Sequence, residues 1–242
     1  MLESGIWRGA GAFSFFPRPG ILGIRRLSLE PLEFDVTDHL DGSLSHYFLQ
    51  MRPLGAEFES GDQFELNLQR SADVPSAAFE IFPGSTIPAG RHAWSRVELV
   101  FTSSNARTVG IRFTGSSGGF YDGHSSEADA AVDIRLAPHL TSSLEYALQA
   151  VTRAVGDFTA RTVRLRLDLA ASPRLGGTMF IQQDNASDRL TINLRLHWIP
   201  RPGSDAYLVY NSAWPTGSSG GIPWSRPAAG GLVAKFVYYV RG

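Results

Sequence analysis

The residues most capable of chemistry lie in one short stretch that holds Tyr121, Asp122, His124, Glu127 and Asp129. Carboxylates and imidazoles bind metal ions when three or four of them converge on one point. Asp122, Glu127 and Asp129 would be the oxygen ligands of a calcium site, which calcium-dependent melting would reveal. Glycines surround the stretch, and Asp and His are ordinary residues of such turns. The sequence therefore favours a turn without metal, in which Tyr121, Asp122 and His124 are candidates for ligand or partner contact.

The remaining signatures of catalysis are weak. The six histidines are scattered and show no spacing typical of ligand pairs; they are residues 39, 46, 92, 124, 139 and 197. The glycine-rich segments 115–119 and 217–221 do not follow strand-to-helix geometry and carry no P-loop lysine. Cysteine is absent, which excludes disulfides, thiolate zinc sites, cysteine nucleophiles and iron–sulfur clusters. We therefore expect no enzyme, no cofactor and no metal.

Aromatic side chains offer a second kind of site. Five tryptophans are spread along the chain, at positions 7, 94, 198, 214 and 224. In a membrane barrel they would form interfacial girdles, and in a sandwich most would belong to the core. Trp214 and Trp224 flank a glycine- and proline-rich segment, where they would stack on a sugar or contact a protein partner. These two residues are the second candidate contact site.

The elements that would position these residues are strands. Leu190, Ile192, Leu194, Leu196 and Trp198 alternate with polar residues, and a second segment alternates in the same way from Val163 to Leu169. Successive side chains of a strand point to opposite faces, so each segment has one apolar and one polar face. The predicted lining of the polar face includes Arg164, Arg166, Arg195 and His197.

Similar alternation recurs along the chain and predicts an all-β fold, an antiparallel meander of roughly 12–14 strands. A membrane-type β-barrel is the first architecture that this pattern suggests, and a soluble barrel or sandwich is the second. Segment 142–155 also fits helical spacing, with a capping box of Ser142 and Glu145, but its surroundings favour a strand. We expect a single domain over 1–242, irregular over 1–20 and with a long loop over 214–231.

The charge and hydropathy of the sequence limit the classes of partner that it can have. The formal net charge of -1 argues against a nucleic-acid partner. The sequence contains no run of about 18 apolar residues, so it predicts no transmembrane helix. The first twenty residues lack the pattern of a signal peptide. If the protein is exported, we expect the numbering to begin after processing, or the chain to be part of a longer polypeptide.

An ordered series of motifs resembles a known family. It comprises IPAG (Ile87 to Gly90), GGFYDG (Gly118 to Gly123), GDF (Gly156 to Phe158), the long segment from Phe180 to Asn211, and LVAKFVYYV (Leu232 to Val240). Together these motifs resemble the C-terminal region of an uncharacterised bacterial family of putative outer-membrane β-barrels. In that family the barrel region follows an N-terminal carbohydrate-binding-module-like domain. The segment from Gln182 through Tyr210 is the most specific part.

The resemblance implies a non-enzymatic β-barrel-type protein of the bacterial cell envelope, structural or pore-like, with the lipid bilayer as its partner. Two departures suggest alternatives. The chain ends Val240-Arg241-Gly242, without the terminal aromatic residue of outer-membrane barrels. The second expectation is therefore a membrane-extrinsic scaffold subunit that docks onto a membrane protein complex. The N-terminal sandwich of the family is missing from this sequence, so its glycan-binding activity is not carried over. A glycan-binding module, with Trp214 and Trp224 as the contact residues, is the third expectation.

Overall fold

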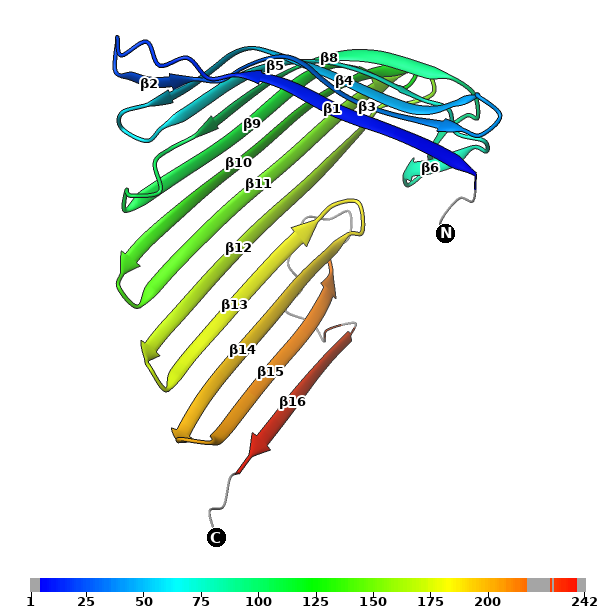
Figure 1. Ribbon diagram of the computed structural model, residues 1–242. Helices are drawn as coiled ribbons and strands as arrows, with labels where there is room; N and C mark the ends of the chain where they lie inside the picture. Colours follow the sequence, from blue (N-terminus) through cyan, green and yellow to red (C-terminus); the bar gives the residue numbers. More distant parts are fainter. Residues whose placement is uncertain (1–4, 217–226, 228, 239–242) are drawn as a thin grey trace. The chain divides into compact units, whose positions relative to one another are not determined.

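The computed structural model describes residues 5–216, 227 and 229–238, and these residues form strands and no helix (Figure 1). The strands are β1 (Ile6–Phe15), β2 (Ile24–Leu27), β3 (Leu29–His39), β4 (Leu44–Phe58), β5 (Gln63–Asp73), β6 (Phe79–Phe82), β7 (Ser85–Ile87), β8 (His92–Thr102), β9 (Val109–Phe120), β10 (Gly123–Ala137), β11 (Leu140–Arg153), β12 (Phe158–Ser172), β13 (Leu175–Asp184), β14 (Arg189–Arg201), β15 (Ser204–Pro215) and β16 (Ala229–Val237). The described residues contain no helix long and apolar enough to cross a membrane.

The all-β antiparallel meander is confirmed. Fourteen of the described strands form one sheet in the order β1-β3-β4-β5-β8-β9-β10-β11-β12-β13-β14-β15-β16, with β2 paired to β4 outside this path. Strands β6 and β7 form a separate two-stranded hairpin. Segment 142–155, for which a helix was the competing prediction, lies mostly within β11.

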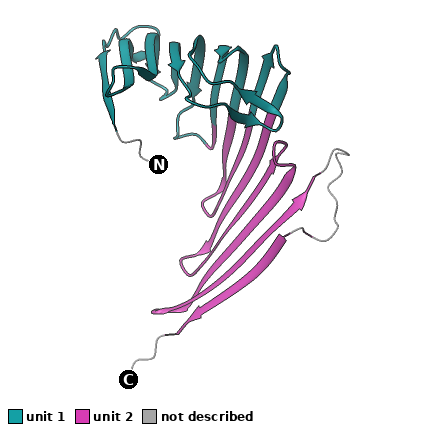
Figure 2. Cartoon of the chain, turned by 90° about the vertical axis from the view of Figure 1, so that its right-hand side faces the viewer, with its two compact units in different colours: residues 1–107, 111–129, 148–159 teal, residues 108–110, 130–147, 160–242 magenta. Residues whose placement is uncertain are grey.

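The chain divides into two compact units (Figure 2). Unit 1 comprises residues 1–107, 111–129 and 148–159, and unit 2 comprises residues 108–110, 130–147 and 160–242. Strands β9 to β12 contribute residues to both units, so no linker separates them. The expectation of a single domain stays a prediction.

Each unit has a polar and an apolar face. In unit 1, Gln69 pairs with Arg96 and Asn67 with Glu98 on the polar face. The adjacent pair, Leu68 and Val97, lies on the apolar face. In unit 2 the same alternation places Arg166 opposite Phe180 on the polar face, and Leu167 opposite Met179 on the apolar face. The two-residue period of the sequence is therefore carried from strand to strand by the register.

In unit 1 the burial of the two faces is the reverse of that in an ordinary soluble sheet. On β8, Leu99 is 42% exposed, whereas the Arg96 side chain is only 13% exposed. Among the described residues only five hydrophobic side chains are buried, and three of these are alanines. The two larger ones are Ile87 and Val151. The sheet is therefore not organised around a conventional hydrophobic core.

The N-terminal segment differs from the prediction. Residues 1–20 were expected to be irregular, but β1 occupies Ile6–Phe15 and pairs with β3. The glycines that suggested irregularity leave room for aromatic rings: a Cβ on Gly9 would lie 2.7 Å from the Trp7 ring. Pro17 and Pro19 follow the strand rather than interrupt it. At the other end, the loop predicted over 214–231 lies largely outside the described residues, although β15 includes Trp214 and Pro215 and β16 begins at Ala229.

Gly55 provides a test of the strand packing in unit 1. A Cβ at this position would lie 2.4 Å from the backbone oxygen of Ser28, whose amide donates to the Gly55 carbonyl. We expect Gly55→Ala to lower the free energy of unfolding by about 1–3 kcal/mol, because the clash is with backbone. Gly231→Ala is the control, since no atom lies within 4 Å of its added Cβ. Denaturant unfolding of both variants checks this, and equal stabilities would contradict the close approach of Ser28.

Candidate functional site

Buried and half-buried polar side chains form a ladder across the polar face of unit 1. The Gln69 side-chain amide donates to Gln50 Oε1 at 3.0 Å, and the Gln50 amide donates to Glu33 Oε2 at 2.9 Å. A second row runs from Arg52 to Asn67 at 3.0 Å and from Asn67 to Glu98 at 2.9 Å. These contacts cross β3, β4, β5 and β8. Such a ladder satisfies polar groups that are partly withdrawn from water.

The ladder continues toward β11 through Glu127. The Arg96 guanidinium lies 2.9 Å from Glu127 Oε1, and the Gln149 amide donates to the same oxygen at 2.8 Å. Gln149 is therefore on the polar face, and Val151 and Arg153 follow it at the two-residue period of β11. This register brings Arg153 to the polar face near the end of the strand.

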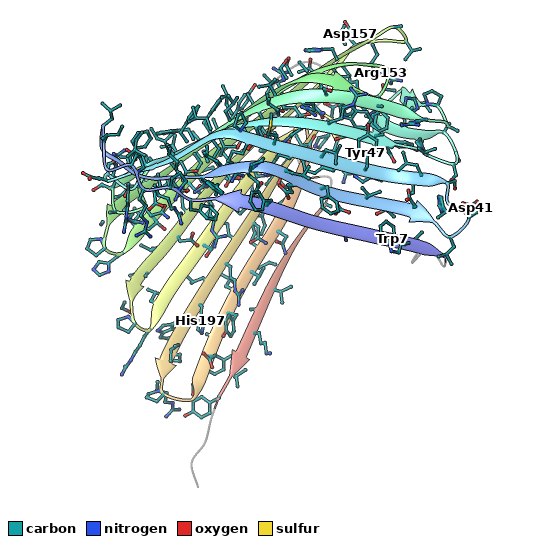
Figure 3. All side chains as sticks on the ribbon, turned by 45° about the horizontal axis from the view of Figure 1, so that its top comes forward. Trp7, Asp41, Tyr47, Arg153, Asp157 and His197 are labelled. Atoms are coloured by element: carbon teal, nitrogen blue, oxygen red, sulfur yellow. The ribbon has the colours of Figure 1, made fainter. Side chains whose placement is uncertain are left out.

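The Arg153 side chain donates hydrogen bonds to three other residues, and it is fully buried. Its Nε and Nη2 donate to the two carboxylate oxygens of Asp122 at 2.6 and 2.9 Å. Nη1 donates to Ser85 Oγ at 2.7 Å, and Nη2 donates to the Thr86 carbonyl at 2.8 Å. The Arg153 amide donates to Asp157 Oδ1, and both residues lie at one end of the strands (Figure 3). The guanidinium thus joins the β9–β10 turn to the β6–β7 hairpin.

Tyr121 lies beside this group in the β9–β10 turn, at a positive φ of 50°. Its hydroxyl donates to Asp73 Oδ2 at 2.9 Å. Its ring contacts four other rings, which belong to Phe79, His92, Trp94 and Phe120. Burial, followed by the hydrogen bond to the Asp73 carboxylate, raises the pKa of Tyr121 to about 12. Tyr121 therefore connects the hairpin residue Phe79 to β5 and β8.

The acidic residues near Tyr121 do not converge. Asp122 is engaged by Arg153, whose hydrogen bonds hold the pKa of that carboxyl below its ordinary value. Glu127 is engaged by Arg96 and Gln149. Among the described residues no group of three or more His, Asp or Glu side chains is arranged to hold a metal ion. The calcium alternative at Asp122, Glu127 and Asp129 is therefore not supported.

His124 contacts a serine on the apolar face. Its Nε2 lies 3.0 Å from Ser117 Oγ, which also lies 3.0 Å from Ser126 Oγ. Ser117 belongs to the segment Gly-Ser-Ser-Gly-Gly, but this segment lies within β9 and not at a strand-to-helix turn. The hydrogen bonds of His124 in the described part of the chain include no carboxylate that would orient it as a base. The pair is therefore a polar contact on this face.

In unit 2 the register of β12, β13 and β14 places the four predicted polar-face residues on one face of the sheet. They are Arg164, Arg166, Arg195 and His197. Arg164 pairs with Gln182, and Arg166 binds Asp168 at 2.7 Å. Arg195 lies over the Tyr207 ring, and His197 stacks on that ring and contacts Asp205 at 2.8 Å. That these side chains line a lumen stays a prediction.

The predicted tryptophan site is only partly visible. Trp214 lies on β15 and pairs with Leu190 of β14. Trp224 lies outside the described residues. No conclusion about a shared contact surface follows from Trp214 alone. Trp198, by contrast, is 49% exposed on the apolar face, where an interfacial aromatic residue would lie.

Sequence reasoning missed Arg153. Alternation along β11 signals a strand, but Arg153 is separated from its partners Ser85 and Asp122 by 68 and 31 residues in the sequence. The only local signal was that Arg153 follows Gln149 and Val151 at the two-residue period and so lies on the same face of β11. Its role depends on where the hairpin packs.

The Arg153 group yields a stability prediction. We expect Arg153→Lys to lower the free energy of unfolding by about 1–3 kcal/mol, because an ammonium keeps the charge but loses the bidentate fork. Arg161→Lys is the matched control, since Arg161 is exposed and lies on the neighbouring strand β12. Denaturant unfolding measures both variants. Equal loss in the two would show that the guanidinium geometry of Arg153 is unimportant.

Tyr121 yields a pH prediction. Its folded-state pKa of about 12 lies above the ordinary value of 10.0, so folding favours the neutral phenol. This contribution to stability is complete below pH 10 and is lost as the pH rises toward about 12. Ultraviolet absorbance of tyrosinate should show a late titration step that Tyr121→Phe removes. A late step that persists in Tyr121→Phe would assign it to another tyrosine.

Comparison with known proteins identifies no family. No family model matches the chain, and no curated protein matches it. The resemblance to putative outer-membrane barrels therefore stays an expectation, supported by the sequence motifs alone. The case for a function thus rests on the geometry of the two faces and of the hairpin.

Proposed function

We propose that the protein is a non-enzymatic β-barrel-type protein of the bacterial cell envelope, structural or pore-like, with its sheet embedded in a lipid bilayer. The observation that carries the proposal is the reversed burial of the two faces. In unit 1, large apolar side chains are exposed on one face, while arginines, glutamates and amides are buried or half-buried and hydrogen-bonded on the other. Lipid on the apolar face and water on the polar face match both surfaces.

The energetic argument concerns the apolar face. Leaving a large apolar side chain in water instead of burying it forfeits about 1.5–3 kcal/mol. This face carries many such side chains over several neighbouring strands, among them Leu49, Leu68, Val97, Leu99 and Phe113. Contiguous apolar patches of that kind mark a surface that is covered in use. A bilayer would cover all of them together, whereas a small partner would cover only some.

Strand length is compatible with this environment. A strand that crosses a membrane at a tilt needs about 9–11 residues. β8 has 11 residues, β14 has 13 and β12 has 15. The short strands β6 and β7 lie outside the large sheet and would not need to span. Apart from β2, which has four residues, the sheet strands are thus long enough for the proposed role.

A membrane-extrinsic scaffold subunit is the second candidate. The observation that favours it is β16, at one end of the strand path, where all nine residues are exposed. Leu232 and Phe236 share its apolar face, and one edge of the strand has no partner in the described sheet. Such an edge suits pairing with a strand of a membrane protein complex. A glycan-binding role depends on Trp214 and Trp224 and has no further support.

Two substitutions on adjacent residues of β8 distinguish lipid from water on the apolar face. We expect Leu99→Arg to impair insertion by about 2–4 kcal/mol if the residue lies near the bilayer midplane. Val100→Arg, on the polar face opposite Glu65, should insert like the parent chain. Heat-modifiable gel migration after refolding into vesicles measures the inserted fraction.

Other outcomes of these experiments would refute the membrane proposal. A chain that folds and stays soluble without detergent, and that tolerates Leu99→Arg as well as Val100→Arg, would refute the membrane proposal. Release of the native protein from membranes by high salt, together with larger partners, would instead favour the scaffold subunit.

A further inference from the structure

The β6–β7 hairpin lies between β5 and β8 in the sequence but outside the sheet that they form (Figure 1). Its partners include residues of the polar side. Ser85 and Thr86 accept hydrogen bonds from Arg153, and the Phe82 ring stacks on Phe158 with centroids 4.7 Å apart. Phe79 contacts Tyr121 edge-on. The hairpin is therefore folded against the polar face of unit 1.

The hairpin also supplies the packing that the sheet lacks. Ile87 has no exposed surface, and Val151 of β11 is 2% exposed. These are the two buried hydrophobic residues larger than alanine in the described part of the chain. Ser125 and the Arg153 side chain are fully buried in the same unit. The large buried hydrophobic side chains of the described residues thus belong to the hairpin and to β11.

We propose that the β6–β7 hairpin is a constriction that narrows the polar passage of the protein and that Arg153 is its latch. This proposal rests on the proposed pore-like function, because a constriction requires a polar passage beside the sheet. The latch joins three elements: the hairpin through Ser85 and Thr86, the β9–β10 turn through Asp122, and β11 through Arg153 itself. The hairpin excludes large polar solutes, and Arg153 keeps it in place.

The latch is suited to this role by its geometry. A guanidinium donates in several directions within one plane, so it binds Asp122 bidentately and still reaches two atoms of the hairpin. A lysine offers a single ammonium and does not reproduce that fork. Loss of the guanidinium therefore releases the hairpin without removing any residue from it.

The absence of native cysteine allows a direct test of the latch in detergent. Ile87→Cys places a thiol at a fully buried position, and Thr86→Cys places one at the adjacent exposed position. We expect the thiol at position 87 to react with a maleimide at least about tenfold more slowly than that at position 86. Adding Arg153→Lys should raise the rate at position 87 by about tenfold and leave position 86 unchanged. Arg161→Lys is the control.

Solute entry tests the constriction. The cysteine-free parent, Arg153→Lys and Arg161→Lys are each reconstituted into phosphatidylcholine–phosphatidylglycerol vesicles, and swelling in neutral oligosaccharides of increasing size is measured. We expect Arg153→Lys to admit larger oligosaccharides than the parent and the Arg161→Lys control. Asp122→Asn, which weakens the same latch from the other partner, should change the size limit in the same direction.

The outcomes separate the two proposals. Equal labelling at positions 86 and 87 in the parent would overturn the latch. A released hairpin with an unchanged size limit would overturn the constriction while leaving the pore intact. Inserted protein that admits no solute in any variant would overturn the pore-like function, and the constriction with it, whatever the labelling shows. Slow labelling at position 87, faster in Arg153→Lys together with a larger size limit, supports the proposal.

Discussion

The structure depends on one constraint: polar side chains that are withdrawn from water must find partners among themselves. Groups such as Arg52, Asn67 and Glu98 would each be costly to bury alone. The register places Asn67 directly opposite Glu98, and Arg52 reaches Asn67 from the irregular stretch of β4 between Met51 and Leu54. Among the described residues, Nε of Arg26 and Nε of Arg96 are the exceptions, because both are buried without a hydrogen-bond partner.

The hairpin is the exception to this arrangement. It brings Ile87 and Phe82 to the polar side, which also carries charged and amide groups such as Glu98 and Gln69. Arg153 connects the hairpin to the sheet, because its guanidinium binds both the Asp122 carboxylate of the β9–β10 turn and the Thr86 carbonyl of the hairpin. The ion pair is only partly buried, since the Asp122 side chain is 32% exposed, but removal of Asp122 would leave the buried Arg153 guanidinium without its carboxylate. The group is therefore better understood as fixing the hairpin's position than as stabilising the fold.

The period of two in the sequence was sufficient to predict the strands and their faces. Leu165, Leu167 and Leu169 share a face because alternation is a local property, and local properties are visible in a sequence. β1 was missed because glycine counts against a strand until the ring that covers it is known, as for Trp7 over Gly9. Arg153 was missed because its role arises from contacts between segments far apart in the chain. Local periodicity carries no information about such contacts.

The strand order places a further demand on the proposed membrane role. With β2 outside the path, the path through the described sheet has thirteen strands, and it is an antiparallel meander. In such a meander the first and thirteenth strands run in the same direction, so β1 and β16 would pair in parallel if they paired directly. In lipid every backbone amide and carbonyl needs a partner, and a free edge is not tolerated. An embedded sheet must therefore close through a parallel pair or gain one more antiparallel strand. The exposed edge of β16 is where such a strand would add.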